Sequence, residues 1–565
     1  MKLHLPKILC MAVMGAIALP TMGADTTYPY VQENEDGSYY MNVGFSPVDG
    51  TTDMWIKDYT PTDGTLSVGK NDLIGAFVAS EDGTLQKENL HTSFANGMGN
   101  SSNVSNTLRV KGDVNISYNG KIQLGGQSHS NVYTGLIANN VTIDSTATGS
   151  GEAVGSYYPN ANLFATRVYL DTLTVNGGAA VIHADQYGGN SFIGSADGGT
   201  SLGALKMAVV NSSIKVTGDG YLSIGRGYNN NFYVTGLGSG FMGGNKAISI
   251  TQEGGTLKLV GRTLATGGMN VTQDKGVMSI ANGYVLSMSG NTSKRNTITQ
   301  SDKSLVETSL TIGQITGSTT GFDIKQDGAG TINLTNGVTY TSKTASTITQ
   351  SGGGKINLSG NFSSTVFDIT QSKGTINLNN GATMQSNKLA LDTNALLNIA
   401  GSLTLNEGGT FEIDVNSAHD AAINIGATGS LVATKQALSL SLNEAVVSDM
   451  MDTVESATES GLLTYTIDLI SSTDISKLNT LSDTLTWKWE GLPQTAALAA
   501  DTTTTVTSYE YIGSDLVVNQ MDDGTYMLQA AITWDVTAEE QIPEPATATL
   551  SLLALAGLAA RRRRR

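Results

Sequence analysis

The sequence predicts an all-β protein in which a parallel β-helix (β-solenoid) is flanked by two smaller regions. Three observations support this fold class: the composition, a repeat of about 24 residues, and the alternation of side chains within that repeat. Glycine accounts for 66 of 565 residues, charged residues for 14% and hydrophobic residues for 39%. Low charge with this share of hydrophobic residues does not fit disorder, and glycine, threonine, serine and asparagine around short β-branched segments are typical of strands and tight turns.

The middle of the chain repeats a pair of short strand patterns. A segment such as Phe322-Asp-Ile-Lys-Gln326 precedes a polar, usually glycine-containing turn and a second segment such as Thr331-Ile-Asn-Leu334. Repeats of about 20 to 50 residues are typical of solenoids, propellers or arrays, and a propeller blade needs four strands and about 40 residues. Two or three short strands per repeat therefore favour one coil of a parallel β-helix. The glutamines that end the first segments are Gln252, Gln273, Gln300, Gln326, Gln350 and Gln371.

The alternation within each repeat predicts which side chains face the core. Phe322, Ile324 and Gln326 share one face of a strand, whereas Asp323 and Lys325 share the other. The glutamines therefore have inward parity at the strand ends. Coils stacked about 4.8 Å apart bring neighbouring amides within hydrogen-bonding reach, as in the glutamine ladders of cross-β assemblies. We expect a structural glutamine ladder, and a row of ligand-binding glutamines is the alternative.

The rest of the chain divides around this repeat. Residues 1–24 combine Lys2, Lys7, an apolar stretch and small residues, which predicts a secretory signal peptide. Residues 25–100 are predicted to form an N-terminal cap region, and weaker strand repeats extend the β-solenoid over 101–436. Residues 437–537 predict a C-terminal cap or β-domain with some helical spacing over 438–460, followed by a linker and a tail at 543–565.

The charge and the reactive side chains exclude several classes of function. The net charge is −17, so no nucleic-acid partner is expected, because phosphate binding requires a basic surface. The only cysteine, Cys10, lies in the predicted signal peptide, which leaves no thiol nucleophile. The remaining histidines lack metal-ligand spacing, so we expect no metal, no cofactor and no catalytic residue. These histidines are His91, His129, His183 and His419.

An enzymatic alternative remains open on the sequence alone. Pectinase-like hydrolases and lyases use β-helices, and glycoside hydrolases need two carboxylates about 5 to 9.5 Å apart, which adjacent coils can supply. Asp323 and Asp368 share a repeat position and are the natural candidates. Both occur singly among Thr, Asn and Lys, as on a solvated face. We therefore expect a protein that is not an enzyme, with a carbohydrate-active or glycan-binding β-helix as the alternative.

The C-terminal tail has three parts. Pro543, Glu544 and Pro545 are followed by a mostly apolar run over 546–560, and then by Arg561, Arg562, Arg563, Arg564 and Arg565. This arrangement resembles the PEP-CTERM sorting signal of Gram-negative bacteria, which implies export by the secretion machinery and recognition by exosortase. As a helix, the 15 residues of the apolar run span about 22 Å, which is short of the roughly 30 Å hydrocarbon core of a membrane. We therefore expect a transmembrane helix that is held only transiently in the inner membrane, with the arginines in the cytoplasm. A short permanent tail anchor is the alternative.

These features together predict an exported structural or adhesive protein of the cell envelope, the cell surface or the extracellular space. The body resembles autotransporter passenger and adhesin β-helices in general pattern, without a motif that matches one family. The resemblance of the tail implies extracellular polysaccharide or host glycans as candidate partners. Nothing in the residues of the body identifies a ligand.

Overall fold

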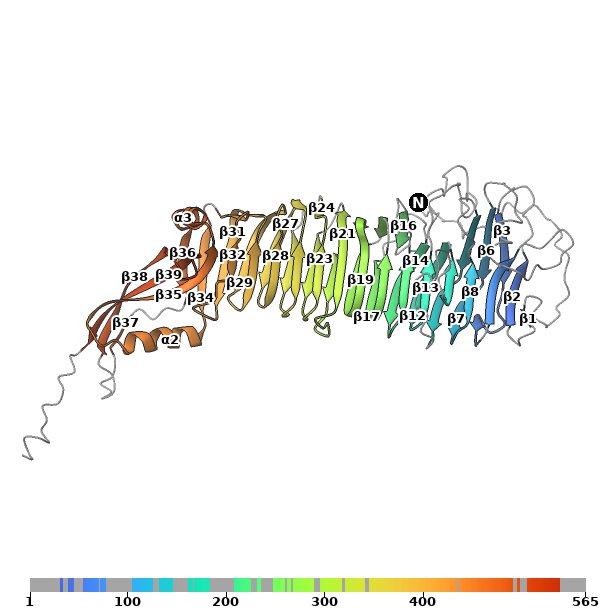
Figure 1. Ribbon diagram of the computed structural model, residues 1–565, viewed down its shortest axis with the longest axis horizontal. Helices are drawn as coiled ribbons and strands as arrows, with labels where there is room; N and C mark the ends of the chain where they lie inside the picture. Colours follow the sequence, from blue (N-terminus) through green and yellow to red (C-terminus); the bar gives the residue numbers. More distant parts are fainter. Residues whose placement is uncertain are drawn as a thin grey trace, which may run out of the picture. The chain divides into compact units, whose positions relative to one another are not determined.

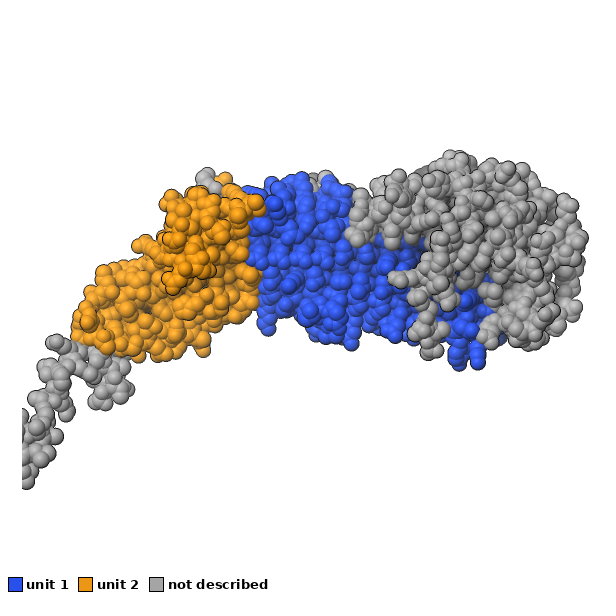
Figure 2. All heavy atoms as spheres, viewed as in Figure 1, with its two compact units in different colours: residues 1–388, 397–406 blue, residues 389–396, 407–565 orange. Residues whose placement is uncertain are grey.

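The computed structural model describes most of the repeat region and the segments around it. Its described residues fall into two compact units, residues 1–388 with 397–406 and residues 389–396 with 407–565 (Figure 2). The described ranges are 31–33, 39–44, 54–70, 72–77, 104–124, 132–145, 161–165, 167–182, 208–224, 231–234, 247–259, 262–265, 268–288, 295–317, 321–340, 345–433, 436–490, 495–497 and 506–538.

The first unit is built almost entirely of short strands, which follow one another along the chain (Figure 1). Its strands are β1 (Val31–Glu33), β2 (Tyr39–Gly44), β3 (Met54–Tyr59), β4 (Thr65–Val68), β5 (Asp72–Phe77), β6 (Val104–Val110), β7 (Asp113–Ser117), β8 (Lys121–Leu124), β9 (Val132–Ile137), β10 (Asn140–Asp144), β11 (Leu163–Ala165), β12 (Arg167–Asn176), β13 (Ala179–Ile182), β14 (Ala208–Thr217), β15 (Tyr221–Ile224), β16 (Asn231–Val234), β17 (Ile248–Leu259), β18 (Arg262–Ala265), β19 (Met269–Met288), β20 (Asn296–Gln300), β21 (Ser309–Gly317), β22 (Phe322–Gln326), β23 (Thr331–Leu334), β24 (Val338–Tyr340), β25 (Ser346–Gln350), β26 (Lys355–Leu358), β27 (Asn361–Gln371) and β28 (Gly374–Leu378). Three more strands contribute residues to both units: β29 (Thr383–Asp392), β30 (Ala395–Ile399) and β31 (Ser402–Val415).

In the described coils of the first unit the chain runs through three columns of strands, and from β2 onward each column pairs in parallel with the same column of the next coil. One coil consists of β22, β23 and β24; β22 pairs with β25 and β23 pairs with β26 of the following coil. The pairing is parallel in the same way from β2 with β5, β3 with β6 and β4 with β7 onward. Three columns of parallel strands therefore enclose one core. This arrangement confirms the predicted all-β parallel β-helix.

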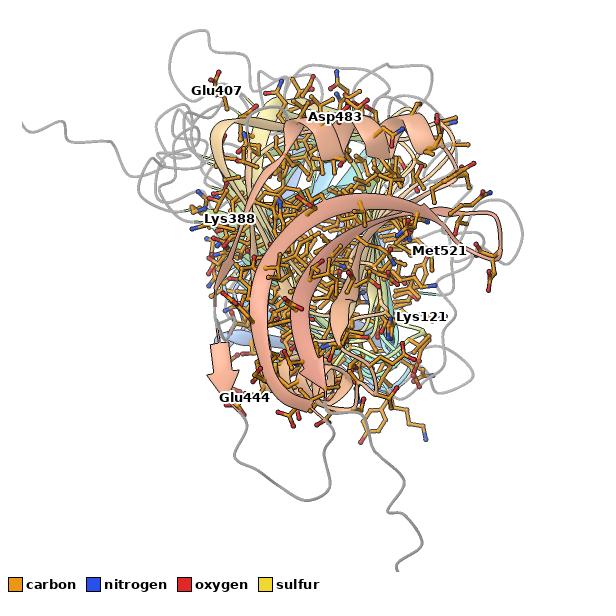
Figure 3. The ribbon with its side chains drawn as sticks, turned by 90° about the vertical axis from the view of Figure 1, so that its left-hand side faces the viewer. Lys121, Lys388, Glu407, Glu444, Asp483 and Met521 are labelled. Carbon is orange, nitrogen blue, oxygen red and sulfur yellow. The ribbon has the colours of Figure 1, made fainter. Side chains whose placement is uncertain are left out.

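The core of the coils follows the predicted parity. Along β22 the buried residues are Phe322, Ile324 and Gln326, whereas Asp323 and Lys325 reach the surface. Phe322 and Phe367 pack edge to face with ring centroids 5.7 Å apart, and Phe362 packs against Phe367 at 6.0 Å. Seen along the coil axis, side chains fill the interior between the strands (Figure 3). Buried aliphatic and aromatic rows stabilise the coils mainly through the hydrophobic effect.

The described residues of the second unit combine the last coil strands with an antiparallel sheet and the helices α2 and α3. β31 pairs in parallel with β34, which pairs in parallel with β36, while β39 pairs antiparallel with both β35 and β38. The short strand β37 pairs antiparallel with β38. The elements of this unit are β32 (Ile423–Ile425), β33 (Ser430–Val432), β34 (Ala437–Leu442), α2 (Glu444–Glu455), β35 (Gly461–Ser472), α3 (Ile475–Thr484), β36 (Thr486–Glu490), β37 (Thr495–Ala497), β38 (Val506–Gln520) and β39 (Tyr526–Ala538).

Both helices begin at a polar cap and bury one apolar face. The Asn443 side chain accepts a hydrogen bond from the backbone N–H of Val446 at 2.8 Å, which caps α2 inside the segment where the sequence predicts helical spacing. Asp474 caps α3 through the N–H of Ser476 at 3.0 Å. The buried faces consist of Val446, Met450 and Val454 in α2 and of Leu478 and Leu481 in α3.

Parallel strands also occur in the region for which the sequence predicts an N-terminal cap. Strands β2 to β5 lie within 25–100, the predicted N-terminal cap region, yet β2 pairs in parallel with β5, and β5 with β8. Among the described strands of this region, β1 is antiparallel to its neighbour β2. At the other end, the predicted boundary between 436 and 437 lies inside the second unit. The predicted signal peptide, at 1–24, lies outside the described residues.

Candidate functional site

The six repeat glutamines occupy matching positions in one column of strands. Gln326 pairs in register with Gln300 on one side and with Gln350 on the other, and the same register continues through Gln273 to Gln252 and through Gln350 to Gln371. From Gln273 onward, each Nε2 donates to the Oε1 of the glutamine in the preceding coil. In chain order, the five N···O distances are 2.9, 2.9, 3.0, 2.5 and 3.0 Å. This inner glutamine ladder spans six coils without interruption.

Five of the six amides, all but that of Gln300, also close the turn that follows their strand. The Nε2 of Gln326 donates to the carbonyl oxygen of Gly330 at 2.6 Å, and that of Gln350 donates to the carbonyl of Gly354 at 2.8 Å. A Cβ on Gly354 would lie 2.5 Å from the Gln326 Nε2, and a Cβ on Gly374 would lie 2.7 Å from the Gln350 Nε2. Glycine is needed there because backbone carbonyl oxygens and the glutamine amide of the preceding coil together occupy the space of a side chain. The glutamine and the glycine of the repeat thus form one structural unit.

The inner glutamine ladder is enclosed by the coils. All six glutamines are at most 1% exposed. Their amides bond to each other and to backbone carbonyls, which is how buried polar groups avoid the cost of desolvation. Because a ligand cannot reach side chains in this position, the geometry favours the structural interpretation over a row of ligand-binding glutamines.

A second amide row runs along the outside of a neighbouring column. Nδ2 of Asn357 donates to Oδ1 of Asn333 at 2.7 Å, Asn377 donates to Asn357 at 2.7 Å, and Asn398 donates to Asn377 at 2.9 Å. Asn333 in turn donates to the Thr311 hydroxyl at 3.5 Å. These four asparagines, on β23, β26, β28 and β30, form the outer asparagine ladder. They are half-buried, so their amides meet both the neighbouring coil and the solvent.

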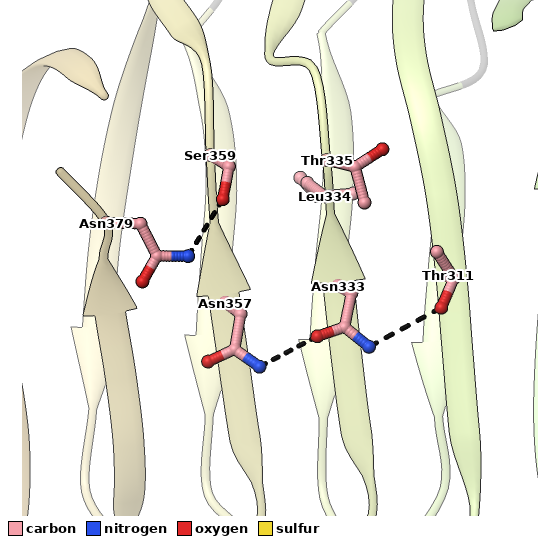
Figure 4. Close-up of a pocket in the computed structure, with 7 residues that line it drawn as sticks. All are labelled: Thr311, Asn333, Leu334, Thr335, Asn357, Ser359 and Asn379. Atoms are coloured by element: carbon pink, nitrogen blue, oxygen red, sulfur yellow. Dashed lines mark hydrogen bonds between the residues drawn. The ribbon is translucent and has the colours of Figure 1, made fainter. Parts of the chain in front are cut away.

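A shallow hollow lies beside the outer asparagine ladder, at the bend after the strands. It has a volume of about 460 Å³ and is open to solvent. Figure 4 shows two rows facing it, the asparagines on one side and a second row that includes Ser359 and Asn379 on the other. Asn379 donates to the Ser359 hydroxyl at 2.8 Å. The lining residues are Thr311, Asn333, Leu334, Thr335, Asn357, Ser359 and Asn379, and none of these seven is charged.

Charged side chains of the same coils meet on a different column. Arg295 contacts Asp323 through Nη2 at 2.7 Å and Nε at 2.8 Å, and its Nη2 also donates to the Ala345 carbonyl at 2.8 Å. The Thr347 hydroxyl donates to Asp323 at 2.6 Å. Thr347 lies between Asp323 and Asp368 in register, so the two candidate carboxylates are two coils apart. Asp323 is thereby held in an ion pair that bridges successive coils.

One more carboxylate is fixed by the loop that follows β20. Ser301 donates to Asp274 at 2.7 Å and Lys303 contacts its other oxygen at 2.9 Å. Burial raises the pKa of Asp274, but the hydrogen bonds from Ser301 and Lys303 and the charges of Lys303 and Lys275 outweigh it, so the pKa lies below its usual value. The hydrogen bond and charge of Asp274 raise the pKa of the exposed Lys303. These groups hold a turn in place.

In the second unit, a phenol fastens helix α2 to strand β35. The Tyr465 hydroxyl donates to Asp449 at 2.6 Å. Burial first, and then the hydrogen bond and charge of Asp449, raise the pKa of Tyr465 well above its usual range. Trp534 lies at the centre of this unit, between the rings of Tyr509 and Tyr511 at 5.6 Å each.

Several sequence-predicted residues lie outside the described part of the chain. His91, His129 and His183 do, whereas His419 is exposed in the loop after β31. Within the described ranges no cluster of three or more metal-ligating side chains occurs, and no helix there is long and apolar enough to cross a membrane. The tail residues Pro543, Glu544, Pro545 and Arg561 to Arg565 lie beyond residue 538, the last described one.

Comparison with known proteins identifies the tail. Residues 541–565 match the PEP-CTERM protein-sorting motif. The motif implies processing by exosortase, and export with sorting to the cell surface in bacteria that have this enzyme. The chain as a whole matches no curated protein. The sorting motif therefore covers only the tail, and the function of the body must be argued from its own residues.

Sequence reasoning missed two features of this site. The hollow was not predicted because it depends on the bend after each strand, although the repeated asparagine of Asn333, Asn357 and Asn377 was a visible signal of an outer row. The steric coupling between glutamine and glycine was also missed. Its signal is the glycine three or four residues after Gln252, Gln273, Gln326, Gln350 and Gln371.

Proposed function

We propose that this protein is a structural and adhesive β-solenoid of the cell surface, delivered there by an exosortase system. One observation carries the structural part of the proposal. The outward polar side chains bond from coil to coil, as in the outer asparagine ladder and the pair of Thr347 with Asp323. Side chains that repeat along a column and bond to their own copies stiffen the coils. A stiff, acidic, disulfide-free body with a surface-sorting tail suits a scaffold.

The carboxylates of the coils support this proposal over a hydrolase. A retaining or inverting glycosidase needs one carboxylate poised as an acid and a second as nucleophile or base across an open site. Asp323 is instead paired with Arg295, and Asp274 with Lys303. Asp368 lies two coils from Asp323, and its Oδ1 is buried rather than open to a substrate. Incubating the purified chain with a panel of polysaccharides and measuring released reducing ends tests this. Reproducible turnover would overturn the scaffold proposal.

The proposed route to the surface has a separate test. Replacing Arg561 to Arg565 with glutamine removes the charges that keep the end of the tail in the cytoplasm, so processing and surface delivery should fall. In the parent, mass spectrometry of the surface fraction should find a C-terminus at or near Pro543 to Pro545. Recovery of an intact chain ending at Arg565 from the surface would contradict exosortase processing and would favour a permanent tail anchor.

A second candidate function is glycan binding. The observation that favours it is the uncharged hollow beside the outer asparagine ladder, where amide and hydroxyl groups converge. Such groups are the usual partners of sugar hydroxyls.

A further inference from the structure

We propose that the hollow beside the outer asparagine ladder binds a linear, uncharged, hydroxyl-rich polymer, that is, a neutral polysaccharide, along the stacking direction of the coils. The proposal rests on the surface location proposed above. It specifies which residues of the body contact the ligand and which chemical class the ligand has.

The asparagine amides of the ladder have unused hydrogen-bonding capacity. A primary amide has two N–H donors and two acceptor sites on its oxygen. Within the ladder, Asn357 uses one donor toward Asn333 and one acceptor site toward Asn377. Because Asn357 is half-buried beside the hollow, the second donor and the second acceptor site are directed to a ligand or to water. Asn333 has the same arrangement one coil earlier.

The amides of the ladder are also preorganised. Each asparagine is held by its neighbours in the adjacent coils, so binding does not have to immobilise a free side chain. The opposite side is also held, because Asn379 donates to Ser359. The donors and acceptors recur at the spacing of the coils, about 4.8 Å. A ligand with repeating hydroxyl groups can therefore contact several coils at once.

None of the seven residues that line the hollow is charged. The nearest charge on the same face of β26 is the exposed Lys355, two residues before Asn357. The ion pairs of Arg295 with Asp323 and of Lys303 with Asp274 belong to the column of β20 and β22 instead. A neutral ligand is favoured, because amide and hydroxyl groups compensate the desolvation of hydroxyls but not that of carboxylates.

The experiment uses the full chain, exported by an exosortase-bearing host and purified from the surface fraction. Cellohexaose, galactomannan and dextran serve as neutral probes and polygalacturonate as the anionic probe. Affinity is measured by isothermal titration calorimetry or by affinity electrophoresis. Two variants alter the hollow: Asn357→Ala removes a central amide, and Ser359→Tyr fills the space while leaving the asparagines in place. Circular dichroism and thermal melting establish that each variant is folded.

A matched control is available in the same unit. Asn406 donates to Asn387 at 2.9 Å, so Asn406→Ala breaks an asparagine pair between coils outside the lining of the hollow. We expect at least one neutral probe to bind the parent and the control equally, with affinity reduced about tenfold or more in both hollow variants, which corresponds to about 1.4 kcal/mol. Retention of parental affinity in folded Ser359→Tyr would overturn the site.

The other outcomes are equally decisive. Binding of none of the neutral probes by the folded parent would overturn the inference while leaving the scaffold function intact. Binding of polygalacturonate alone, lost in Lys355→Gln, would replace the neutral ligand with an anionic one and so overturn the ligand class. Failure of the chain to reach the surface, detected by fractionation before any binding assay, would instead count against the proposed function.

Discussion

Substitution of Gln350 tests whether the inner glutamine ladder stabilises the coils. The Gln350 amide donates to Gln326 at 2.5 Å, to Gly354 at 2.8 Å and to Thr375 at 3.4 Å, and accepts from Gln371 at 3.0 Å. In Gln350→Ala the Oε1 of Gln326 loses the amide that donates to it. The other former partners keep a hydrogen bond. Gln371 still donates to the Gly374 carbonyl, and the Gly354 carbonyl still accepts from the N–H of Thr375. One orphaned buried acceptor costs about 1 to 3 kcal/mol, and the lost buried methylene adds about 0.8 kcal/mol. We therefore expect a loss of about 2 to 4 kcal/mol.

Gln350→Glu should be worse at neutral pH and should improve with acid. An ionised carboxylate has no donor for Gln326 Oε1 or for the carbonyls of Gly354 and Thr375, and its burial raises its pKa above the roughly 4.3 of an exposed glutamate. Because the folded state then binds the proton more tightly than the unfolded state, the penalty grows as pH rises above about 4.3. Below that pH the protonated group can donate to Gln326, and the variant should approach Gln350→Ala or exceed it in stability.

The assay is urea denaturation at pH 7 and pH 4.5, combined with hydrogen exchange at the backbone amides of Gly354 and Thr375. Thr349→Ser, an outward substitution one residue before Gln350, is the control and should change the free energy of unfolding by less than about 0.5 kcal/mol. The reasoning is refuted if Gln350→Glu unfolds at the same urea concentration as the parent at pH 7. That result would mean that the amide meets solvent in the folded protein.

Three further predictions concern single contacts. Gly354→Ala should cost about 1 to 3 kcal/mol, because the new Cβ would lie 2.2 Å from the Gly330 carbonyl oxygen and 2.5 Å from the Gln326 Nε2. Gly353→Ala, where nothing lies within 4 Å, should be nearly neutral, and equal urea midpoints for the two variants would contradict the close approach of the coils at Gly354. Asp274→Asn should be less stable than the parent above about pH 4 and should match it in stronger acid, because the lowered pKa of Asp274 in the folded state adds stability that is lost as pH falls. Urea denaturation across this pH range, with Asp302→Asn as the control, measures the effect. A difference in stability that does not change with pH would argue against a role for the charge of Asp274. Tyr465→Phe should destabilise the second unit by about 1 to 2 kcal/mol, because it removes the 2.6 Å hydrogen bond from the Tyr465 hydroxyl to Asp449. A double-mutant cycle with Asp449→Asn should show coupling between the two residues. Additive effects would mean that this hydrogen bond contributes nothing to stability.

Much of the fold follows from local sequence patterns. Side chains alternate along a strand, so Phe322, Ile324 and Gln326 could be assigned to the core and Asp323 to the surface without a structure. The recurrence of the glutamine then predicts which residues stack, because equivalent positions of successive coils lie in register. The C-terminal strand segments were recognisable for the same reason.

Other features depend on distant contacts that no local pattern records. The antiparallel pairing of β39 with β35 joins segments more than 50 residues apart in sequence, and helix α3 has only ten residues. Arg295 carries no repeat signal, yet it reaches Asp323 in the next coil and the Ala345 carbonyl in the coil after that. The hollow arises where the chain bends after Leu334 and Leu358, so its existence depends on backbone geometry.

The two ladders also share a direction, which bears on how an exported chain folds. From Gln273 to Gln371, and from Asn333 to Asn398, every amide donates to the coil that precedes it in the chain. The backbone carbonyl partners of Gln326 and Gln350 fix this orientation, because a carbonyl oxygen can only accept. A growing edge therefore presents side-chain oxygens to the amides of the next coil, and that coil also supplies the backbone carbonyls of Lys355 and Thr375 to the Nε2 atoms of Gln326 and Gln350. Export that begins at the N-terminus, as the predicted signal peptide implies, would deliver the coils in this order, so that folding could advance one coil at a time.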